Sequence, residues 1–524
     1  MRSTVHIGET RQKVRRPRLK SCKFQPIRTI DEMTTAGSIT IRRWLCPSLV
    51  DVFFVALFLA LFAPPHGLEA LLADGDTGWH IRTGELVIAT GRVPTSDPFS
   101  FSRPGQPWFA WEWLSDVLFA RLNRWAGLAG VAAAAGTVLA LTGAALFARL
   151  LRDGVGLWVA LAATLAAASA SSIHYLARPH VFSFLLYTIS VGWIEADMRR
   201  PGWLVWMLIP LAALWANLHG AFLLLPATLA AASLTAGRGG RVRYAALSFL
   251  TAAATLVNPY GWRLHEHLWQ YLRSSWILDH VQEFQSPSIR GEAAVVFGLL
   301  LLSSMALAWR ASRFEATLVL GLGFAALRSA RHIPFFAIAA APVVATAAAA
   351  AWRRLAERET PRSPVRVMWD LSLDFGRQWR ASGWIAAAAL LTVWLAAHQG
   401  AQFPSSRFPA RAVDRNSGLL AGPEAPRVLT SDQWADYLIY RLYPRGRVFF
   451  DGRSDFYGAA IGADYRRLLS SEEGWRDLLR QYNFSAALLP RDWPLSTILD
   501  REPGWRLAYR DSVAKLFLRE VRTP

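Results

Sequence analysis

The sequence has few cysteines and few charged residues for its length. Cys22 and Cys46 are the only cysteines among 524 residues, so neither a disulfide framework nor a cysteine-ligated metal site is expected. Charged residues make up only 18% of the chain, whereas hydrophobic residues make up 53% and include 24 tryptophans. Soluble domains carry about 25% charged residues, so this composition indicates a polytopic membrane protein.

Several catalytic signatures are also missing. The chain contains no GxGxxG, Walker, HExxH or GxSxG motif, which leaves nucleotide hydrolysis and serine or zinc hydrolase chemistry with little support. The N-terminal region lacks the apolar core of a cleaved signal peptide. We therefore expect a basic cytoplasmic tail over residues 1–48, followed by a first span that is retained as a signal-anchor.

Long apolar runs dominate the region 49–398, and each approaches the length that crosses a hydrocarbon core of about 30 Å. The eleven predicted spans are 49–66, 128–150, 155–173, 180–197, 202–217, 219–236, 242–258, 293–310, 314–329, 333–352 and 382–398. Many of these runs are rich in alanine and glycine, which favour close helix packing inside a membrane. The sequence thus predicts an α-helical polytopic fold with about eleven transmembrane helices.

Basic residues are concentrated on one side of this predicted topology. The net charge is +19, and residues 1–48 alone hold eleven Lys and Arg against three acids. Further basic segments, at 149–152, 199–200, 238–243, 310–313 and 353–380, fall on the same side. The positive-inside rule makes that side the cytoplasm. Since no basic-aromatic groove or binding motif accompanies the charge, no nucleic-acid partner is expected.

The first loop on the opposite side, residues 67–127, carries the densest set of reactive side chains. It contains Asp74 and Asp76, then His80 and Glu112, within the stretch DGDTGWHIRTGE…PWFAWEW. Its tryptophans suit a membrane interface, and its prolines fix its path. The tryptophans are Trp79, Trp108, Trp111 and Trp113. A connecting loop needs only polarity and flexibility, so this composition favours an active site at the membrane boundary.

Other polar motifs fall on the same outer face: HYLARPH, WANLHG, NPYGWRLHEH and LRSARHIP. They supply basic and imidazole side chains, namely Arg178, His180, His219, Arg328, Arg331 and His332. Basic residues there oppose the positive-inside trend, and a basic cluster near the outer leaflet suits a phosphate or pyrophosphate. The alternative for each motif is structural, since a proline can simply start or end a helix. Clustering on one face favours the functional interpretation.

Residues 399–524 alternate short β runs with amphipathic helices, which predicts a small soluble α/β domain outside the cytoplasm. Its densest polar motif is FDGRSDFYG, with Asp451, Arg453, Asp455 and Tyr457. This motif either binds a ligand at the end of a strand or forms a structural turn with an Asp–Arg pair, and we slightly favour the turn.

The segments DGDTGWHIRTGE…GRVPTSDPFSF…PW…EWL, LARPHVFSF, LWANLHGAF, NPYGW and RHIPFFA resemble a group of bacterial polytopic membrane glycosyltransferases of the GT-C superfamily. The likeness extends over roughly residues 50–520. It implies a bacterial inner-membrane enzyme of the cell envelope that uses a polyprenyl-phosphate-linked sugar as donor. It also implies an inverting transfer to a glycan, lipid or protein acceptor. The DGD pair departs from the acidic pairs of many GT-C enzymes, so the motif alone leaves the base open.

Chemistry assigns candidate roles to the outer-face residues. An acceptor hydroxyl is a weak nucleophile near neutral pH, and a carboxylate can accept its proton during attack on the anomeric carbon. Asp74 and Asp76 are the candidate bases. The candidates for binding phosphate or substrate are His80, Glu112, Arg178, His180, His219, Arg328, Arg331 and His332. No cofactor is expected, although the two aspartates with Glu112 form an alternative site for a divalent cation.

Three other classes of function remain open. A polymerase or ligase of lipid-linked glycans would use outer-face arginine and histidine without an acidic base. A lipid transporter or flippase would need polar residues through the membrane, whereas the spans here are mostly alanine and leucine. A non-enzymatic assembly or sensor protein would explain the soluble domain but not the acidic loop.

Overall fold

The computed structural model describes residues 47–63, 67–288, 290–377, 382, 384–397, 400–421 and 426–520. These residues belong to one compact unit, Pro47–Pro524. The predicted basic tail lies outside the described residues except for Pro47 and Ser48, and both cysteines lie outside them as well.

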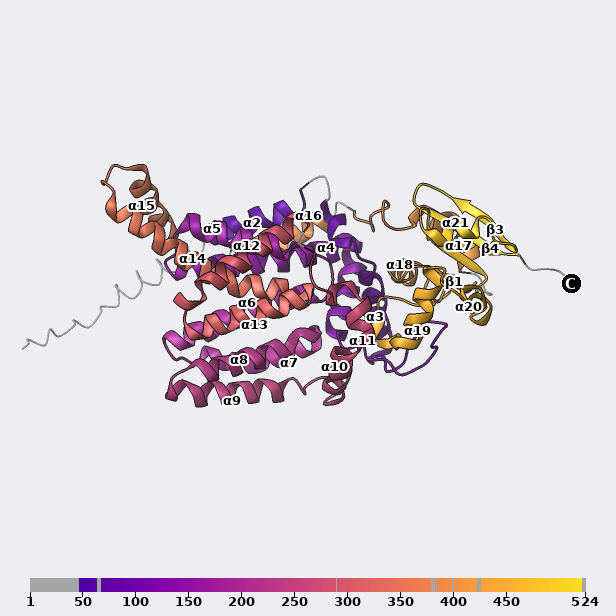
Figure 1. Cartoon of the computed structure of the whole chain (residues 1–524), viewed down its shortest axis with the longest axis horizontal. Helices are drawn as coiled ribbons and strands as arrows, with labels where there is room; N and C mark the ends of the chain where they lie inside the picture. Colours follow the sequence, from indigo (N-terminus) through magenta and orange to yellow (C-terminus); the bar gives the residue numbers. More distant parts are fainter. Residues whose placement is uncertain are drawn as a thin grey trace, which may run out of the picture. The chain divides into compact units, whose positions relative to one another are not determined.

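Within the described residues, every predicted span contains a helix. These helices are α2 (Leu49–Leu61), α4 (Trp113–Arg152), α5 (Leu157–Ser171), α6 (His180–Arg199), α7 (Leu208–Leu218), α8 (Leu224–Thr235), α9 (Arg238–Ala254), α12 (Glu292–Leu307), α13 (Arg313–Arg328), α14 (Ile333–Arg358) and α16 (Trp384–Ala397). Most of them lie side by side as a bundle (Figure 1). Close packing follows from small residues: a Cβ on Gly136 or Gly143 of α4 would come 2.5 Å from Phe62 or Leu57.

Five described segments are long and apolar enough to cross a membrane alone. They are Trp113–Arg152, Leu157–His174, His180–Arg199, Glu292–Arg310 and Ala330–Arg358. Shorter apolar helices include Leu49–Leu61, Leu204–Leu218, Gly220–Thr235 and Trp384–Leu395. The chain is therefore a helical membrane protein, and the number of eleven spans stays a prediction.

The predicted first loop contains more helix than its polarity suggested. After the short 3₁₀ helix η1 (Gly67–Leu72), α3 (Asp76–Thr90) holds most of the DGDTGWHIRTGE motif. Helix α4 begins at Trp113 rather than at the predicted residue 128, and it kinks at Ala126–Gly127. The prediction from hydropathy located only the apolar part of the helix. Polar residues that pack against neighbouring protein extend the helix beyond that part.

Two of the loop tryptophans are not interfacial, so that prediction was wrong for them. Trp79 and Trp108 keep only 6% and 4% of their surface exposed, and their rings pack edge to face at 6.2 Å. Trp113 donates its indole N–H to Asn217 Oδ1 at 2.8 Å. These rings therefore fix the loop against the helix ends.

The C-terminal region forms a four-stranded sheet with helices, which confirms the predicted small α/β fold. Its elements are α17 (Ala410–Leu420), β1 (Val428–Leu429), α18 (Asp432–Leu442), α19 (Ser454–Leu469), α20 (Trp475–Gln481), β2 (Ala486–Pro490), α21 (Pro494–Leu499), β3 (Trp505–Arg510) and β4 (Ala514–Arg519). The strand order is β1-β2-β4-β3, with β1 and β2 parallel and the other pairs antiparallel.

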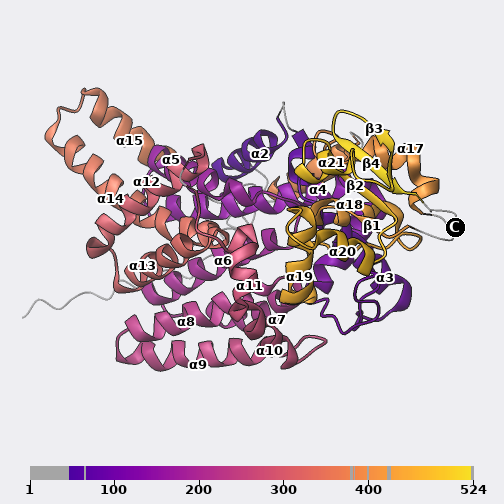
Figure 2. The same ribbon diagram turned by 45° about the vertical axis from the view of Figure 1, so that its right-hand side comes forward.

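The first loop joins this sheet. The backbone of Val448 bonds Phe99 and Phe101 and forms single bridges with Ser100 and Val428. Val448 thus lies in a short extended segment where the sequence predicted a β run. Helix α18 lies against α3, and α19 lies against α11 (Ser275–His280); Figure 2 shows the C-terminal elements gathered around the first-loop region. Two further α-helices are α10 (Arg263–Arg273) and α15 (Pro364–Gly376).

Candidate active site

A cavity of about 350 Å³ opens where the first loop, the helix ends and the C-terminal domain meet. Eight predicted site residues line it: Asp76, His80, Glu112, Arg178, His180, His219, Arg331 and His332. Two predicted residues do not. Asp74 lies just behind the wall and bonds a lining residue, whereas Arg328 is exposed at the end of α13.

Arg178 is the centre of the polar wall. Its guanidinium bonds Asp76 at 2.7 Å, Asp74 at 3.1 Å and Glu283 at 2.5 Å. Burial opposes the charged form, but the carboxylates outweigh it and raise the pKa of Arg178 well above its ordinary value. Burial alone would also raise the pKa of Glu283, but Arg178 lowers it. One cation therefore holds three acids from two distant parts of the chain.

The local sequence explains how Arg178 reaches these acids. The segment just before it lies against the first loop, because the Ala177 N–H bonds Leu71 O at 2.7 Å. Thr77 Oγ1 donates to Ala177 O at 2.9 Å. Pro179 then allows α6 to start, and its fixed φ suits a helix start. The ARPH motif thus turns Arg178 toward the start of α3.

Asp76 is a buried acid with an unusual proton affinity. Its side chain is at the first position of α3, and the residue is 5% exposed. Burial, opposed by Arg178, raises the pKa of Asp76 to about 7. The helix N-terminus also favours the ionised form. A carboxylate with a pKa near neutrality suits proton transfer at neutral pH.

Glu112 and His80 form another part of the cavity lining. His80 Nδ1 bonds Asp116 Oδ1 at 2.6 Å, and burial lowers the pKa of His80 well below its usual value. Burial also raises the pKa of Glu112 to about 8. Glu112 lies 3.6 Å from His80 and 3.5 Å from His219. Glu112 is therefore mostly protonated at neutral pH and suits a hydrogen-bond donor better than a base.

The imidazoles are oriented by backbone groups. His219 Nδ1 accepts the Ala221 N–H at 3.2 Å, so its own proton lies on Nε2, toward Glu112. His180 Nε2 donates to His174 O at 2.6 Å, and His174 Nε2 donates to Ala330 O at 3.0 Å. These bonds fix the rings along one side of the cavity.

Arg331 differs from Arg178 in forming no direct ion pair among the described residues, although its charge acts on nearby Glu283 and Glu112. Its guanidinium stacks over the Phe284 ring at 4.3 Å. It is half-buried and lines the cavity beside His332. Arg331 is therefore placed to meet an anion, whereas the charge of Arg178 is already balanced.

The C-terminal domain contributes residues that the sequence did not assign to the site. Gly452, Arg453 and Asp455 line the cavity. Arg453 bonds Asp451 at 2.6 Å and Asp97 of the first loop at 2.8 Å, so the favoured Asp–Arg turn is present and also joins the two regions. The density of FDGRSDFYG was the signal for this contact, although nothing in the motif named its partner.

No group of three or more His, Cys, Asp or Glu side chains is placed to hold a metal ion within the described ranges. Asp74 and Asp76 instead share Arg178, and Glu112 faces two histidines. The alternative cation site at these three acids therefore has no matching ligand cluster.

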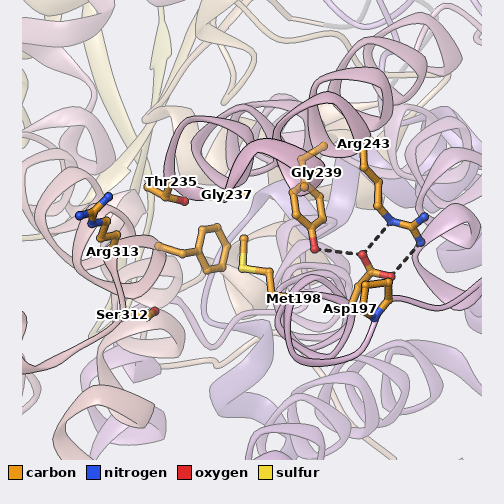
Figure 3. A pocket seen from close by; sticks show the side chains of 13 residues that line it. Asp197, Met198, Thr235, Gly237, Gly239, Arg243, Ser312 and Arg313 are labelled. Atoms are coloured by element: carbon orange, nitrogen blue, oxygen red, sulfur yellow. Dashed lines mark hydrogen bonds and ion pairs between the residues drawn. The ribbon is translucent and has the colours of Figure 1, made fainter.

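A second cavity, of about 650 Å³, lies at the other end of α6. There Arg243 holds Asp197 with two bonds of 2.9 Å, and Figure 3 shows this pair with Arg313 across the cavity. The Tyr244 hydroxyl and the Gly202 N–H also donate hydrogen bonds to the Asp197 carboxylate, at 2.9 and 2.8 Å. Every oxygen of Asp197 thus has a donor.

No family model matches the chain, and no curated protein sequence matches it. Among solved structures, the oligosaccharyltransferase AglB from Archaeoglobus fulgidus, in complex with an inhibitory peptide and a dolichol-phosphate, is similar with a TM-score of 0.53 and 13% identity. That match covers 84% of this chain and 69% of AglB.

ArnT from Cupriavidus metallidurans bound to undecaprenyl phosphate matches at a TM-score of 0.47 and 13% identity, over 89% of this chain and 97% of ArnT. Its apo structure matches at 0.47 and 12%, over 92% and 98%. The fold comparison rests on AglB. The chain therefore shares its overall fold with AglB, an oligosaccharyltransferase.

Proposed function

We propose that this protein transfers a sugar from a polyprenyl-phosphate-linked donor to an acceptor hydroxyl in the cavity beside Asp76. The observation that carries the proposal is a single cavity lined by both Asp76 and Arg331. The pKa of Asp76 is raised to about 7, and Arg331 forms no ion pair among the described residues. The GT-C-like fold, which AglB shares in a dolichol-phosphate-bound form, supports the choice of a lipid-linked donor.

The cavity offers separate surfaces for the two ends of such a donor. The apolar part of the lining includes Leu223, Leu224, Ala227, Leu268 and Leu272. Leu223 and Leu272 are also exposed on the outside of the protein, which gives a lipid chain a path from the bilayer. The polar part of the lining includes the arginines and histidines. This division suits a phosphate attached to a long hydrocarbon.

Helix geometry supports a phosphate on the polar side. His180 is the first residue of α6, and His332 directly precedes α14. Both helix N-termini therefore face the cavity, where their dipoles favour an anion. Arg331 adds a full positive charge beside the second of them. Arg178 positions the acids rather than the phosphate.

The reaction then needs one proton transfer and one displacement. Asp76 accepts the acceptor O–H proton as the oxygen attacks the anomeric carbon. The bond between that carbon and the phosphate oxygen breaks, and the polyprenyl phosphate leaves with the bonding electrons. Arg331 stabilises the charge on the leaving oxygens. A single displacement of this kind inverts the anomeric configuration.

The proposed site faces away from the cytoplasm. The basic segments at residues 199–200, 238–243 and 310–313 all lie at the opposite ends of their helices, and the positive-inside rule assigns those ends to the cytoplasm. Reporter fusions after Arg380 and after Gly400 should report opposite sides of the inner membrane. Fusions that report the same side would contradict this orientation.

The test is consumption of a defined donor. Purified protein in lipid nanodiscs is given a panel of polyprenyl-phosphate hexoses and pentoses with a membrane extract as acceptor, with EDTA in parallel. We expect at least one donor to release free polyprenyl phosphate, with and without EDTA. Release that persists in Asp76→Asn would favour a ligase that needs no acidic base. No release from any donor, together with no binding of polyprenyl phosphate, would contradict the proposal.

A further inference from the structure

Helix α18 brings a buried acid from the C-terminal domain against the start of α3. Asp436 is fully buried on the face of α18 that contacts α3. The approach depends on glycines: a Cβ on Gly75 would come 2.2 Å from Gln433 O, and one on Gly78 would come 2.6 Å from Asp436 O. The Gly75 N–H also bonds Gln433 Oε1 at 2.8 Å. The DGDTG motif thus serves a close helix contact.

The carboxyls of Asp76 and Asp436 meet beside Gly452. A Cβ on Gly452 would lie 2.1 Å from Asp76 Oδ1 and 3.0 Å from Asp436 Oδ2. The other two oxygens are satisfied, because Arg178 bonds Asp76 Oδ2 at 2.7 Å and the Gly452 N–H bonds Asp436 Oδ1 at 3.0 Å. The two facing oxygens are buried and have no donor in the described part of the chain.

Two facing carboxylate oxygens are acceptors only, so without a proton both remain unsatisfied and repel each other. One shared proton satisfies both atoms. It belongs on Asp436, because Arg178 stabilises the charge of Asp76 while the nearest further charge to Asp436 is another acid, Asp451. Burial, and then the charges of Asp76 and Asp451, raise the pKa of Asp436 well above its usual value.

We propose that Asp436 is a positioning residue that stays protonated at neutral pH and donates its O–H to Asp76. This inference rests on the proposed role of Asp76 as the base. The donated hydrogen bond holds Asp76 in its ionised form. The C-terminal domain then supplies part of the proton-transfer machinery rather than only a cover for the site.

Several charged groups face the pair and define its titration. On the side of Asp76 these are Asp74, Arg178 and Glu283. On the side of Asp436 it is Asp451, itself bonded to Arg453. Because these neighbours stay the same in an Asp436 variant, a change in the pKa of Asp76 there is due to Asp436.

The test compares the pH–rate profile of donor consumption in three variants. Asparagine at Asp436 is neutral and keeps an N–H donor, so Asp436→Asn should leave the acid limb of the profile in place. Leucine has a similar size and no donor, so Asp436→Leu should move that limb up by about one to two pH units. Asp432→Asn is the matched control: it removes a half-buried acid of α18 that bonds Tyr465 of α19, and it should leave the limb unchanged.

Other outcomes overturn the proposal. A downward shift in Asp436→Asn would show that Asp436 is normally ionised, and an unmoved limb in both Asp436 variants would show that it does not act on Asp76. Infrared difference spectra keep the test open if the leucine variant fails to fold. The wild-type protein without donor should show the C=O stretch of a protonated carboxylic acid that Asp436→Asn removes, and an unchanged spectrum would contradict the proposal.

The two readouts separate this inference from the proposed function. The infrared signal needs no donor, so its presence with no donor turnover would sink the glycosyl transfer alone. Turnover that depends on Asp76 but not on Asp436 would sink the shared proton alone.

Discussion

Two acid–arginine pairs, Asp76–Arg178 and Asp197–Arg243, lie at opposite ends of α6 and differ in how completely they are satisfied. Asp197 at one end receives donors on both oxygens from Arg243, Tyr244 and the Gly202 N–H. Asp76 at the other end shares its arginine with two further acids and keeps one buried oxygen without a donor among the described residues. A saturated pair stabilises a fold, whereas an incomplete one retains the capacity to take up a proton.

The free arginines at the two ends differ in the same way. Arg331 is half-buried beside an apolar wall and two helix N-termini. Arg313 is exposed at the start of α13 in the wider, second cavity. Volume alone would rank the second cavity first, but the buried and unbalanced charges lie in the smaller one. Unsatisfied charge, rather than size, identifies the site.

The largest expected effect comes from removing the basicity of Asp76. Asp76→Asn keeps the shape and loses the proton acceptor, so turnover should fall by about 10²–10⁴-fold while the protein still inserts and binds donor. The measurement is donor consumption under saturating donor, with folding checked by Tm. Asp197→Asn is the matched control at the other end, and an equal loss of turnover there would erase the distinction between the pairs.

Donor binding should depend on Arg331 next. A charge-assisted hydrogen bond to phosphate contributes about 1.5–3 kcal/mol, so Arg331→Ala should weaken the Kd for polyprenyl phosphate by about tenfold to a hundredfold. Lysine keeps the charge but lacks the paired N–H donors of arginine, so the Kd of Arg331→Lys should lie between those of the wild type and Arg331→Ala. Quenching of the cavity tryptophans Trp79 and Trp108 offers a readout.

Arg313→Ala is the control for this series and should leave the Kd unchanged. Arg328→Ala should do the same, because Arg328 is exposed and does not line the cavity. Equal weakening by all three alanine variants would show that the effect is general surface charge rather than one contact.

The pH dependence of activity should be smaller but characteristic. Asp76 accepts a proton only when ionised, and its pKa is raised to about 7, mainly by burial. The rate should therefore fall by up to about tenfold for each pH unit below neutrality. A profile that is flat from pH 5 to pH 8 would contradict this role.

Stability should respond to pH in the opposite direction. A raised pKa means that the folded state binds the proton of Asp76 more tightly than the unfolded chain does, so this stabilisation is complete below a pH of about 4. It is lost as the pH rises through about 7. Tm measured across this range should decline where activity rises, and Asp76→Asn should reduce that decline.

The smallest effect on activity is expected at the saturated pair. Asp197→Asn removes a buried ion pair, so Tm should drop noticeably because Arg243 loses its partner. The turnover of the protein that remains folded should stay within about twofold, since most effects on stability far from a site do not change its chemistry. A selective loss of turnover at unchanged Tm would assign a function to the second cavity.

The sequence predicted the helices well because apolar runs carry their own signal. Every predicted span contains a helix, and the region after residue 399 has the predicted mixed fold. It predicted the start of α4 poorly, because polar residues of the first turns, such as Ser115 and Asp116, are buried against protein. Their polarity therefore suggested a loop.

The site was predicted in part for a similar reason. One-sided placement of polar motifs brought Asp76, Arg178 and Arg331 onto one candidate list, and the fold places them in one cavity. The same argument could not tell that Arg331 lines the cavity and Arg328 does not. The two arginines point differently only because α13 ends at Arg328 and the chain turns at Ser329. The sequence did not mark Asp436 as a site residue, since it belongs to an ordinary amphipathic helix. It approaches Asp76 only because Gly75 and Gly78 let α18 pack closely against the start of α3.

The most direct measurement is the location of a bound lipid phosphate. A photoreactive polyprenyl phosphate is crosslinked to the protein in nanodiscs, and the labelled peptides are mapped by mass spectrometry. We expect labels around Leu223, Leu272 and Arg331, competed by unlabelled polyprenyl phosphate and weakened in Arg331→Ala. Labels confined to the cavity of Asp197 and Arg313, indifferent to Arg331, would contradict this expectation.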